Sequence, residues 1–132
     1  ISAGRYMNKY GNRKCQYNGI VFDSRHEMAR YRELLLLERG HEISDLRLQV
    51  KYVLIPEQRE KPTEKYLKGP KKGEYKPGNV IEKACTYIAD FVYTDTRSGK
   101  TVVEDAKGMK TEVYKIKKKL MLYNYGIRVI EV

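Results

Sequence analysis

Two acidic residues and a lysine stand inside segments that otherwise have the composition of β-strands. The segment TYIADFVY places Asp90 among apolar residues, and TVVEDAK, which follows a polar turn, contains Asp105 and Lys107. Strand interiors favour β-branched and aromatic residues and disfavour Asp, and an unpaired buried charge is costly. Departures of this kind from local preference are concentrated at functional or strained sites, so these three residues are the first candidates for chemistry.

The spacing of these residues indicates which side chains can meet. Successive residues of a strand point to opposite faces of a sheet, so Asp105 and Lys107 share one face and Glu104 points to the other. If the two segments are neighbouring strands joined by the turn at 94–100, Asp90 lies beside Asp105, with Lys107 close by. The pattern therefore predicts a pair of carboxylates with a lysine next to it.

Such a pair is suited to binding a hard divalent cation. Mg²⁺ takes one or two carboxylates and keeps several waters, lowers the pKa of a bound water and stabilises charge on a phosphodiester. A neighbouring lysine can orient the nucleophile or neutralise developing negative charge. A simpler interpretation is a salt bridge between Asp105 and Lys107 on a solvated sheet face, and the D-x-K spacing alone does not separate the two. The interior Asp90 in a basic chain favours the metal site.

A third carboxylate comes from a predicted helix over 24–39. Ser24, followed three residues later by Glu27, is a capping-box pattern. Glu27 also begins a helical stripe that Tyr31 and Leu34 continue, which turns it toward the core side of the helix. Two interpretations stay open: Glu27 only completes the capping box, or its carboxylate points along the sheet and completes the metal shell.

The remaining elements follow from periodicity and turn residues. Asn18-Gly19 between two short β-prone runs predicts a type I′ hairpin. Four further strands are expected, at 46–55, 83–93, 101–107 and 126–132. A second helix is expected at 112–125, and its apolar residues at helical spacing predict the buried face: Val113, Ile116, Leu120 and Tyr123. The order hairpin, α, β, β, β, α, β predicts an α/β domain with a mixed sheet between helices.

Two basic segments lie outside these elements. Residues 1–14 are basic and weakly patterned, which predicts a mobile N-terminal arm. Residues 56–79 hold all four prolines and many lysines without periodicity, which predicts a long basic loop or ribbon inserted between two strands. The whole chain, 1–132, is expected to form one domain.

Composition narrows the class of protein. With 41% hydrophobic and 33% charged residues the chain is globular, and its net charge of +10 favours a polyanionic partner, most often nucleic acid. No apolar run is long enough for a membrane span, so no membrane partner is expected. Cys15 and Cys85 make neither a zinc motif nor a disulfide framework, which favours reduced thiols and a cytoplasmic location.

The segments FDSRHEMARY, TYIADFVY, VVEDAKGMKTEVYKIKKKL and the closing strand resemble the PD-(D/E)XK nuclease superfamily. More closely, they are similar to small phage proteins of the Holliday junction resolvase type, over about 8–55 and 83–132. The resemblance implies a restriction-endonuclease-like core (α-β-β-β-α-β), Mg²⁺ or Mn²⁺ dependence and hydrolysis of DNA phosphodiesters. The catalytic residues that it implies are Glu27, Asp90, Asp105 and Lys107. The three carboxylates among them are also the implied metal ligands. Ala89, where the superfamily pattern has proline, is a departure.

The expected function is therefore a phage-encoded endonuclease for branched DNA, working in the cytoplasm of a bacterial host. Four-way junctions have symmetric arms, and a homodimer supplies two active sites. Contacts with DNA are expected from basic residues of the arm, the loop and the second helix: Arg13, Lys14, Lys71, Lys72, Lys110, Lys115 and Lys118. The alternatives are a nuclease for flaps, nicks or duplex, and a non-catalytic DNA-binding protein on a decayed nuclease core.

Overall fold

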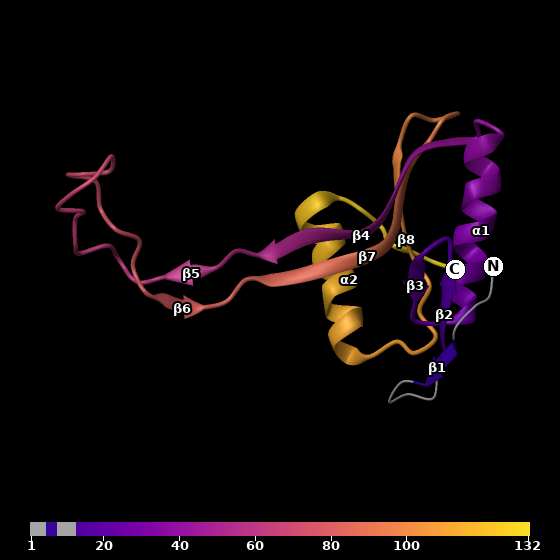
Figure 1. Cartoon of the computed structure of the whole chain (residues 1–132), viewed down its shortest axis with the longest axis horizontal. Helices are drawn as coiled ribbons and strands as arrows, with labels where there is room; N and C mark the ends of the chain where they lie inside the picture. The colour runs from indigo at the N-terminus through magenta and orange to yellow at the C-terminus, as the bar shows by residue number, and fades with distance from the viewer. Residues whose placement is uncertain (1–4, 8–12) are drawn as a thin grey trace.

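The described part of the chain consists of a body built around a bent sheet and a long two-stranded ribbon that projects from the body (Figure 1). This ribbon, at residues 56–84, is called the arm from here on and is distinct from the N-terminal segment 1–14. The computed structural model describes residues 5–7 and 13–132. Its elements are, in chain order, β1 (Arg5–Met7), β2 (Arg13–Tyr17), β3 (Ile20–Phe22), α1 (Arg25–Arg39), β4 (Ile43–Ile55), β5 (Gln58–Arg59), β6 (Val80–Glu82), β7 (Cys85–Asp95), β8 (Thr101–Asp105), α2 (Glu112–Tyr125) and β9 (Ile130–Glu131).

The N-terminal hairpin forms as the sequence predicts, with one addition. Asn18 and Gly19 have φ values of 51° and 77°, the positive values that a type I′ turn requires between β2 and β3. β1 pairs antiparallel with β2, giving a small sheet in the order β1-β2-β3. The expectation of a mobile arm over 1–14 is therefore wrong for 5–7 and 13–14, which are strands, and its remainder lies outside the described residues.

The first helix matches its prediction closely. α1 begins after Ser24, whose side-chain oxygen accepts a hydrogen bond from the backbone N–H of Glu27 at 3.1 Å, and Gly40 forms its C-cap. The buried residues of the helix are Glu27, Tyr31 and Leu34, so the stripe that includes Glu27 does face the sheet. The N-terminal cap thus fixes Glu27 in the first turn, next to the central sheet.

The central sheet has the order β4-β7-β8-β9. β4–β7 and β7–β8 pair antiparallel and β8–β9 pairs parallel, so the sheet is mixed, as expected. The hairpin and α1 cover one face with a core that includes Phe22, Tyr31 and Leu34, and α2 covers the other with Tyr114 and Met121. The prediction of an α/β domain with helices flanking a mixed sheet is confirmed at this level of description.

Part-way along β4 and β7, the side chains of both strands switch between the sheet face covered by α1 and the face covered by α2. In β4, Leu48 packs on the α1 side and Val50 on the α2 side, although strict alternation puts both on one face. Gln49 lies between them with φ 53°, in the left-handed region that non-glycine residues seldom adopt. β7 makes the same exchange between Ala89 and Phe91, and the register is unchanged on both sides of this point. The sheet therefore turns at the pair Gln49–Asp90.

The second helix has the predicted bounds but a different buried face. The buried residues of α2 are Tyr114 and Met121, and Leu120 packs beside them partly buried, whereas Val113, Ile116 and Tyr123 are exposed. The prediction of the Val113 stripe as the core face is wrong. Periodicity finds an apolar stripe on a helix, but the position of the sheet decides which side docks, and here the Tyr114 ring packs beside a sheet tyrosine.

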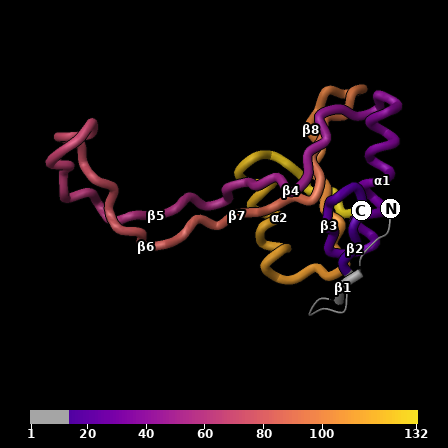
Figure 2. Tube along the Cα trace, in the orientation of Figure 1, coloured from indigo at the N-terminus to yellow at the C-terminus, as the bar shows by residue number. Residues whose placement is uncertain are grey.

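The predicted basic insertion is an ordered ribbon. β5 and β6 continue the β4–β7 ladder away from the body, and Figure 2 shows the unbroken path of the chain out to the tip and back. Near its middle the backbone N–H of Glu60 donates to the carbonyl of Asn79 at 2.8 Å, and a bridge between Lys65 and Tyr75 closes the tip. Gly78 is required at the narrow point, because a Cβ there would lie 1.9 Å from the Glu60 carbonyl oxygen.

Two expectations from the sequence concerned membrane-spanning segments and the two cysteines. None of their helices is long and apolar enough to cross a membrane. Cys15 and Cys85 are not joined in a disulfide.

Candidate active site

The two strand carboxylates lie next to each other where the sheet turns. Phe91 of β7 pairs with Glu104 of β8, so the next position along the ladder sets Asp90 opposite Asp105. One Asp90 oxygen, Oδ2, accepts a hydrogen bond from the backbone N–H of Ala106 at 2.9 Å, which holds the carboxylate against the end of β8. The predicted pair is therefore formed, and both side chains are buried.

Strict alternation would place Asp90 on the same sheet face as Ile88 and Val92. In the structure these three side chains do not share one face. Ile88 is half exposed, whereas Val92 is completely buried in the core under α2. The exchange of faces at Asp90 is the reason, because it interrupts the regular alternation of β7 at this residue. Asp90 points along the sheet toward β8 instead of into either core, which makes a strand-interior carboxylate tolerable here.

Asp105 is fully buried and incompletely satisfied. Its Oδ2 accepts a hydrogen bond from the Tyr87 hydroxyl. Its Oδ1 lies 3.4 Å from Lys107 Nζ, an ion-pair distance, yet it accepts no hydrogen bond from the described residues. Lys107 Nζ also lies 5.6 Å from the centre of the Tyr114 ring, so a cation–π contact helps to hold the ammonium in place. The D-x-K pair therefore forms a salt bridge, at the edge of a cavity and not on a solvated face.

Glu27 joins the pair through an amide that the sequence does not single out. Gln49 Nε2 donates to Glu27 Oε1 at 3.3 Å and to Asp90 Oδ1 at 3.1 Å. The left-handed backbone at Gln49 costs about 1–3 kcal/mol and is retained where the surroundings over-determine it, often at a functional site. Of the two interpretations of Glu27, the helix-capping bond through Ser24 is present, and the carboxylate also reaches the candidate site.

Crowding of carboxylates in a buried place shifts their protonation. Burial first, and then the negative charges of Asp90 and Asp23, raise the pKa of Glu27 to about 7. Burial first, and then the neighbouring Asp90 carboxyl group, raise the pKa of Asp105 to about 7, although Tyr87 and Lys107 oppose the shift. Two carboxyl groups with pKa values near 7, lying beside a third carboxyl group, are typical of functional sites. A positive charge added at such a place would be stabilised.

Glu104, the neighbour of Asp105, belongs to a separate network. It points to the α1 side of the sheet, where its two carboxylate oxygens accept hydrogen bonds from Arg30 Nε and Nη2 at 2.8 and 2.7 Å. The Tyr93 hydroxyl donates to the same carboxylate. This bidentate pair, in which Glu104 is buried and Arg30 is partly exposed, fixes α1 on the sheet. The structure therefore separates two adjacent acids into one that anchors the fold through Arg30 and one that lies beside Asp90 in the candidate site.

Glu27 and Asp90 line an open cavity of about 680 Å³ between α1, β7 and the start of α2, whereas Asp105 is fully buried and is not part of that lining. Three lysines stand in its lining: Lys14 from β2, Lys107 from the end of β8 and Lys117 from α2. Lys14 lies 3.9 Å from Asp23 and keeps much of its side chain exposed. A cavity with acids at the floor and cations at the rim suits a negatively charged, chain-like ligand whose reactive group reaches the acids.

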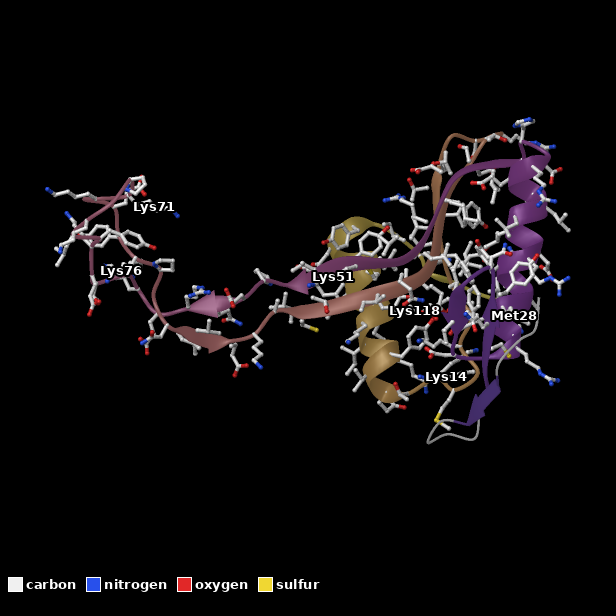
Figure 3. All side chains as sticks on the ribbon, viewed as in Figure 1. Lys14, Met28, Lys51, Lys71, Lys76 and Lys118 are labelled. Atoms are coloured by element: carbon white, nitrogen blue, oxygen red, sulfur yellow. The ribbon has the colours of Figure 1, made fainter. Side chains whose placement is uncertain are left out.

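The expected DNA-binding residues are distributed over the molecule. Lys71 lies at the far end of the arm, as does its neighbour Lys72, while Lys14 and Lys118 lie in the body (Figure 3). Other residues of the set form ion pairs: Lys110 and Lys118 with Glu131, and Lys115 with Glu112. The side chain of Arg13 lies outside the described part. Among the described side chains of this set, Lys14 alone lines the cavity, and Lys117, a lysine that the sequence did not single out, lines it too.

The chemistry of the site fits a hard divalent cation held by two carboxylates. Asp90 and Asp105 supply only oxygen donors, and Asp105 Oδ1 is buried without a hydrogen bond. No group of three or more His, Cys, Asp or Glu side chains in the described ranges is arranged to hold a metal ion. The Gln49 amide donates hydrogen bonds to both Glu27 and Asp90. Mg²⁺ commonly takes just one or two carboxylates and fills its shell with water.

A family model matches residues 7–130, a range that includes both the body and the arm. The family is described as "Protein of unknown function (DUF1064)". This chain belongs to it. No curated protein and no solved structure matches the chain.

Three residues of this DUF1064 site escape detection in the sequence. Gln49 occupies a polar position in a regular apolar–polar alternation, so neither its type nor its spacing stands out. Tyr87 is one of twelve tyrosines. Lys117 is one of four lysines in YKIKKKL, and a correct assignment of the buried face of α2 to Tyr114 and Met121 would have selected it, because it lies on the same side of the helix.

Proposed function

We propose that this protein is a divalent-cation-dependent endonuclease of the PD-(D/E)XK type that hydrolyses phosphodiesters in DNA. The observation that carries the proposal is the buried pair Asp90–Asp105 with Lys107 beside it, of which Asp90 and Lys107 line a cavity that also has Lys14 and Lys117 in its lining. The narrower substrate is branched DNA such as a four-way junction, which is supported by the sequence likeness to junction-resolving phage proteins. The restriction-endonuclease-like core is part of the same proposal.

Each residue of the site has a separate task in this reaction. Asp90 and Asp105 hold the cation, and the backbone N–H of Ala106 and the Tyr87 hydroxyl fix the orientation of their oxygens. When bound, the cation provides a water that ionises near neutral pH and neutralises charge on the phosphate. Lys107 neutralises negative charge next to Asp105 and orients the attacking water.

Glu27 acts beside the pair and not as a preformed third ligand. Its pKa of about 7 allows it to accept or release a proton at physiological pH. Gln49 keeps its carboxylate oriented toward Asp90. The proposal therefore places Glu27 as a proton acceptor for water at the site, with Gln49 as the residue that positions it.

The decisive experiment incubates the purified protein with a synthetic four-way junction and with linear duplexes of the same arm sequences. We expect cleavage of the junction with Mg²⁺ or Mn²⁺, none with EDTA, and much slower cleavage of the duplexes. Flap and nicked substrates of matched length assign the structural preference.

The outcomes separate the candidate functions. Cleavage of flaps or duplex in preference to the junction would retain the nuclease and replace the substrate. Tight binding of DNA with no cleavage in either metal would overturn the catalytic proposal and favour a DNA-binding protein on a nuclease-like core. Calorimetric titration of Mn²⁺ into the protein without DNA gives an independent readout of the site.

A further inference from the structure

The cavity at the carboxylate site has an apolar part to its lining. Ile88 of β7, Met109 in the connection between β8 and α2, and Val113 in the first turn of α2 all line it, and together they are called the apolar wall. The rings of Tyr87 and Tyr114, whose centres are 6.4 Å apart, join β7 to α2 here. The exposed fractions of the three wall residues are 49%, 60% and 61%. Large exposed apolar side chains that line one cavity offer a surface to an apolar group of a ligand.

The same helix places a lysine without a carboxylate partner next to the wall. Val113 and Lys117 are four residues apart on α2, so their side chains are neighbours on the helix surface, and both line the cavity. Lys110, Lys115 and Lys118 each form an ion pair with a glutamate, whereas Lys117, which is partly buried, forms none with the described residues. Its charge is therefore available to an anionic group of a ligand.

These features together select the chemistry of the ligand. The acids of the cavity are recessed, since Glu27 and Asp90 are 5% and 8% exposed, so a phosphate must enter the cavity to reach them. Lys14 and Lys117 line the same cavity and suit the negative charges of neighbouring phosphates. The apolar wall suits neither phosphate nor metal. A polyanion that also carries flat apolar groups, one for each charge, is a nucleic acid strand.

A stacked duplex cannot use the wall. In a duplex each base is covered on both faces by its neighbours, and only its edges are open in the grooves. A nucleotide that has left the stack exposes its base, and proteins hold such a base between aromatic or apolar side chains. The wall therefore fits an unstacked nucleotide better than it fits paired DNA.

We propose that the apolar wall is a nucleobase subsite: the cavity takes an unstacked nucleotide next to the scissile phosphate, with its base on the wall and an adjoining phosphate on Lys117. Within the branched DNA of the proposed function, the recognised feature is then a nucleotide unstacked at the branch and not the symmetry of four arms. Apolar contact with a base face does not read hydrogen-bonding edges, so little sequence preference is expected. The inference rests on the proposed function only in taking DNA as the ligand, because it requires neither metal nor cleavage.

The test measures binding in EDTA, so that the strands stay intact. The probes are two labelled duplexes of the same sequence, one fully paired and one with an unpaired bulge that contains 2-aminopurine. We expect the wild type to bind the bulged duplex about tenfold more tightly than the paired duplex, because stacking a base on a protein side chain is worth about fivefold to a hundredfold in affinity. The fluorescence of the 2-aminopurine should change on binding, because its stacking changes.

Substitutions separate the wall from the lysine. Met109→Ser combined with Val113→Ser should lower the preference for the bulge to about twofold and leave the affinity for paired duplex within about twofold. Met109→Phe should keep the preference, because a ring also stacks on a base. Lys117→Ala should reduce the slope of log K against log salt for the bulged duplex by about 0.9. Leu36→Ser is the matched control, since Leu36 is 65% exposed on α1 and outside the lining. Thermal melts followed by circular dichroism check that each variant is folded.

Each outcome decides for or against the subsite. Equal affinity of the wild type for the two duplexes would overturn it, as would a preference for the bulge that the double serine variant retains. An equal loss for both duplexes in that variant would assign the wall to contact with paired DNA. A wild-type dimer in sedimentation velocity that the double serine variant dissociates would assign the wall to a contact between copies.

Failure of this inference and failure of the nuclease proposal give different results. A protein that binds the bulged duplex through the wall but cleaves no DNA with Mg²⁺ or Mn²⁺ would retain the subsite and overturn the nuclease. A protein that cleaves DNA with Mg²⁺ but binds paired and bulged duplexes equally would retain the nuclease and overturn the subsite.

Discussion

β4 and β7 run through two regions of opposite character. Where they turn, at Gln49 and Asp90, the pair carries buried polar side chains held by hydrogen bonds from an amide, a hydroxyl and a backbone N–H. Toward the arm, the same strands expose apolar side chains such as Val53 and Ile55 to solvent. The body buries charge and the arm exposes apolar surface, and both reverse the usual preference.

The contrast shows that each region is incomplete in a different way. The carboxylate site has excess negative charge, seen in the raised pKa values of Glu27 and Asp105, which a bound cation would offset. The arm has excess apolar surface. Changes to the site and to the arm should therefore have separable effects, and these are ordered from the largest expected effect to the smallest.

Replacing Asp90 should have the largest effect. Asp90→Asn keeps the size of the side chain but removes a carboxylate from the cation site, so cleavage should fall by a factor of about 10² to 10³ or more. Junction affinity should stay within a few fold, because phosphate contacts come from other residues. Rates and binding are measured on the same four-way junction. Asp95→Asn, at the other end of β7, is the matched control, and normal cleavage by Asp90→Asn would show that the site is wrongly assigned.

Substitutions of the adjacent acids Asp105 and Glu104 should have different effects, one on the cleavage rate and the other on the free energy of unfolding. Asp105→Asn should lower the cleavage rate by about two powers of ten, with no loss of stability at pH 8, because it removes a buried charge. Glu104→Gln should keep activity within about tenfold but lower the free energy of unfolding by about 1.5–3 kcal/mol, because it weakens the charged hydrogen bonds to Arg30. Urea unfolding and single-turnover rates measure both. The reverse ranking would contradict the assignment of faces in β8.

Stability should depend on pH through the raised carboxyl groups. Glu27 and Asp105 have folded pKa values of about 7, above their ordinary values of 4.5 and 3.8, so the folded state binds more protons between about pH 4 and pH 7. Their contribution to stability is therefore complete at low pH and is lost as pH rises toward 7. Without metal, the melting temperature of the wild type relative to Asp105→Asn should be lower at pH 8 than at pH 5.

A divalent cation should reverse that trend. Mn²⁺ or Mg²⁺ binds the deprotonated carboxylates, so it should raise the melting temperature at pH 8 more than at pH 5. The increase should disappear in Asp105→Asn. An equal increase in the variant would show that the cation binds elsewhere, and thermal melts at the two pH values with and without metal decide the matter.

The tip of the arm should have the smallest effect. Lys71 and Lys76 contact the Tyr66 ring, at 6.0 and 5.8 Å, so their ammonium groups are held together at the tip. Replacing Lys71, Lys72 and Lys76 by alanine should reduce the slope of log K against log salt by up to about 0.9 for each phosphate that the tip no longer neutralises. Arg97→Ala with Lys100→Ala, in the β7–β8 turn, is the control.

The readout for the tip is junction affinity at several salt concentrations, with the oligomeric mass measured alongside. Equal slopes for the tip variant and the wild type would remove the tip from the DNA-binding surface. A change of mass would show that the tip belongs to an interface between copies of the chain.

Much of the site could be predicted because its parts are local. Asp105 and Lys107 share a face, and Ser24 sets Glu27 in the first turn of α1, through geometry that operates within a few residues. The proximity of Asp90 to Asp105 followed from a short turn between neighbouring strands. The rest of the site could not be predicted, because Gln49 becomes a partner of Glu27 and Asp90 only through a left-handed backbone in a distant strand.

By itself, the sequence determined the two helices and the main strands of the body, their order, the net charge of +10 and the face relations within α1 and β8. The tertiary structure decided which side of α2 meets the sheet, where β4 and β7 exchange faces, and that the proline-rich insertion forms a ribbon instead of a loop. The reason is that periodicity and capping are short-range properties of the chain, whereas docking and bending depend on which surfaces far apart in the sequence come together.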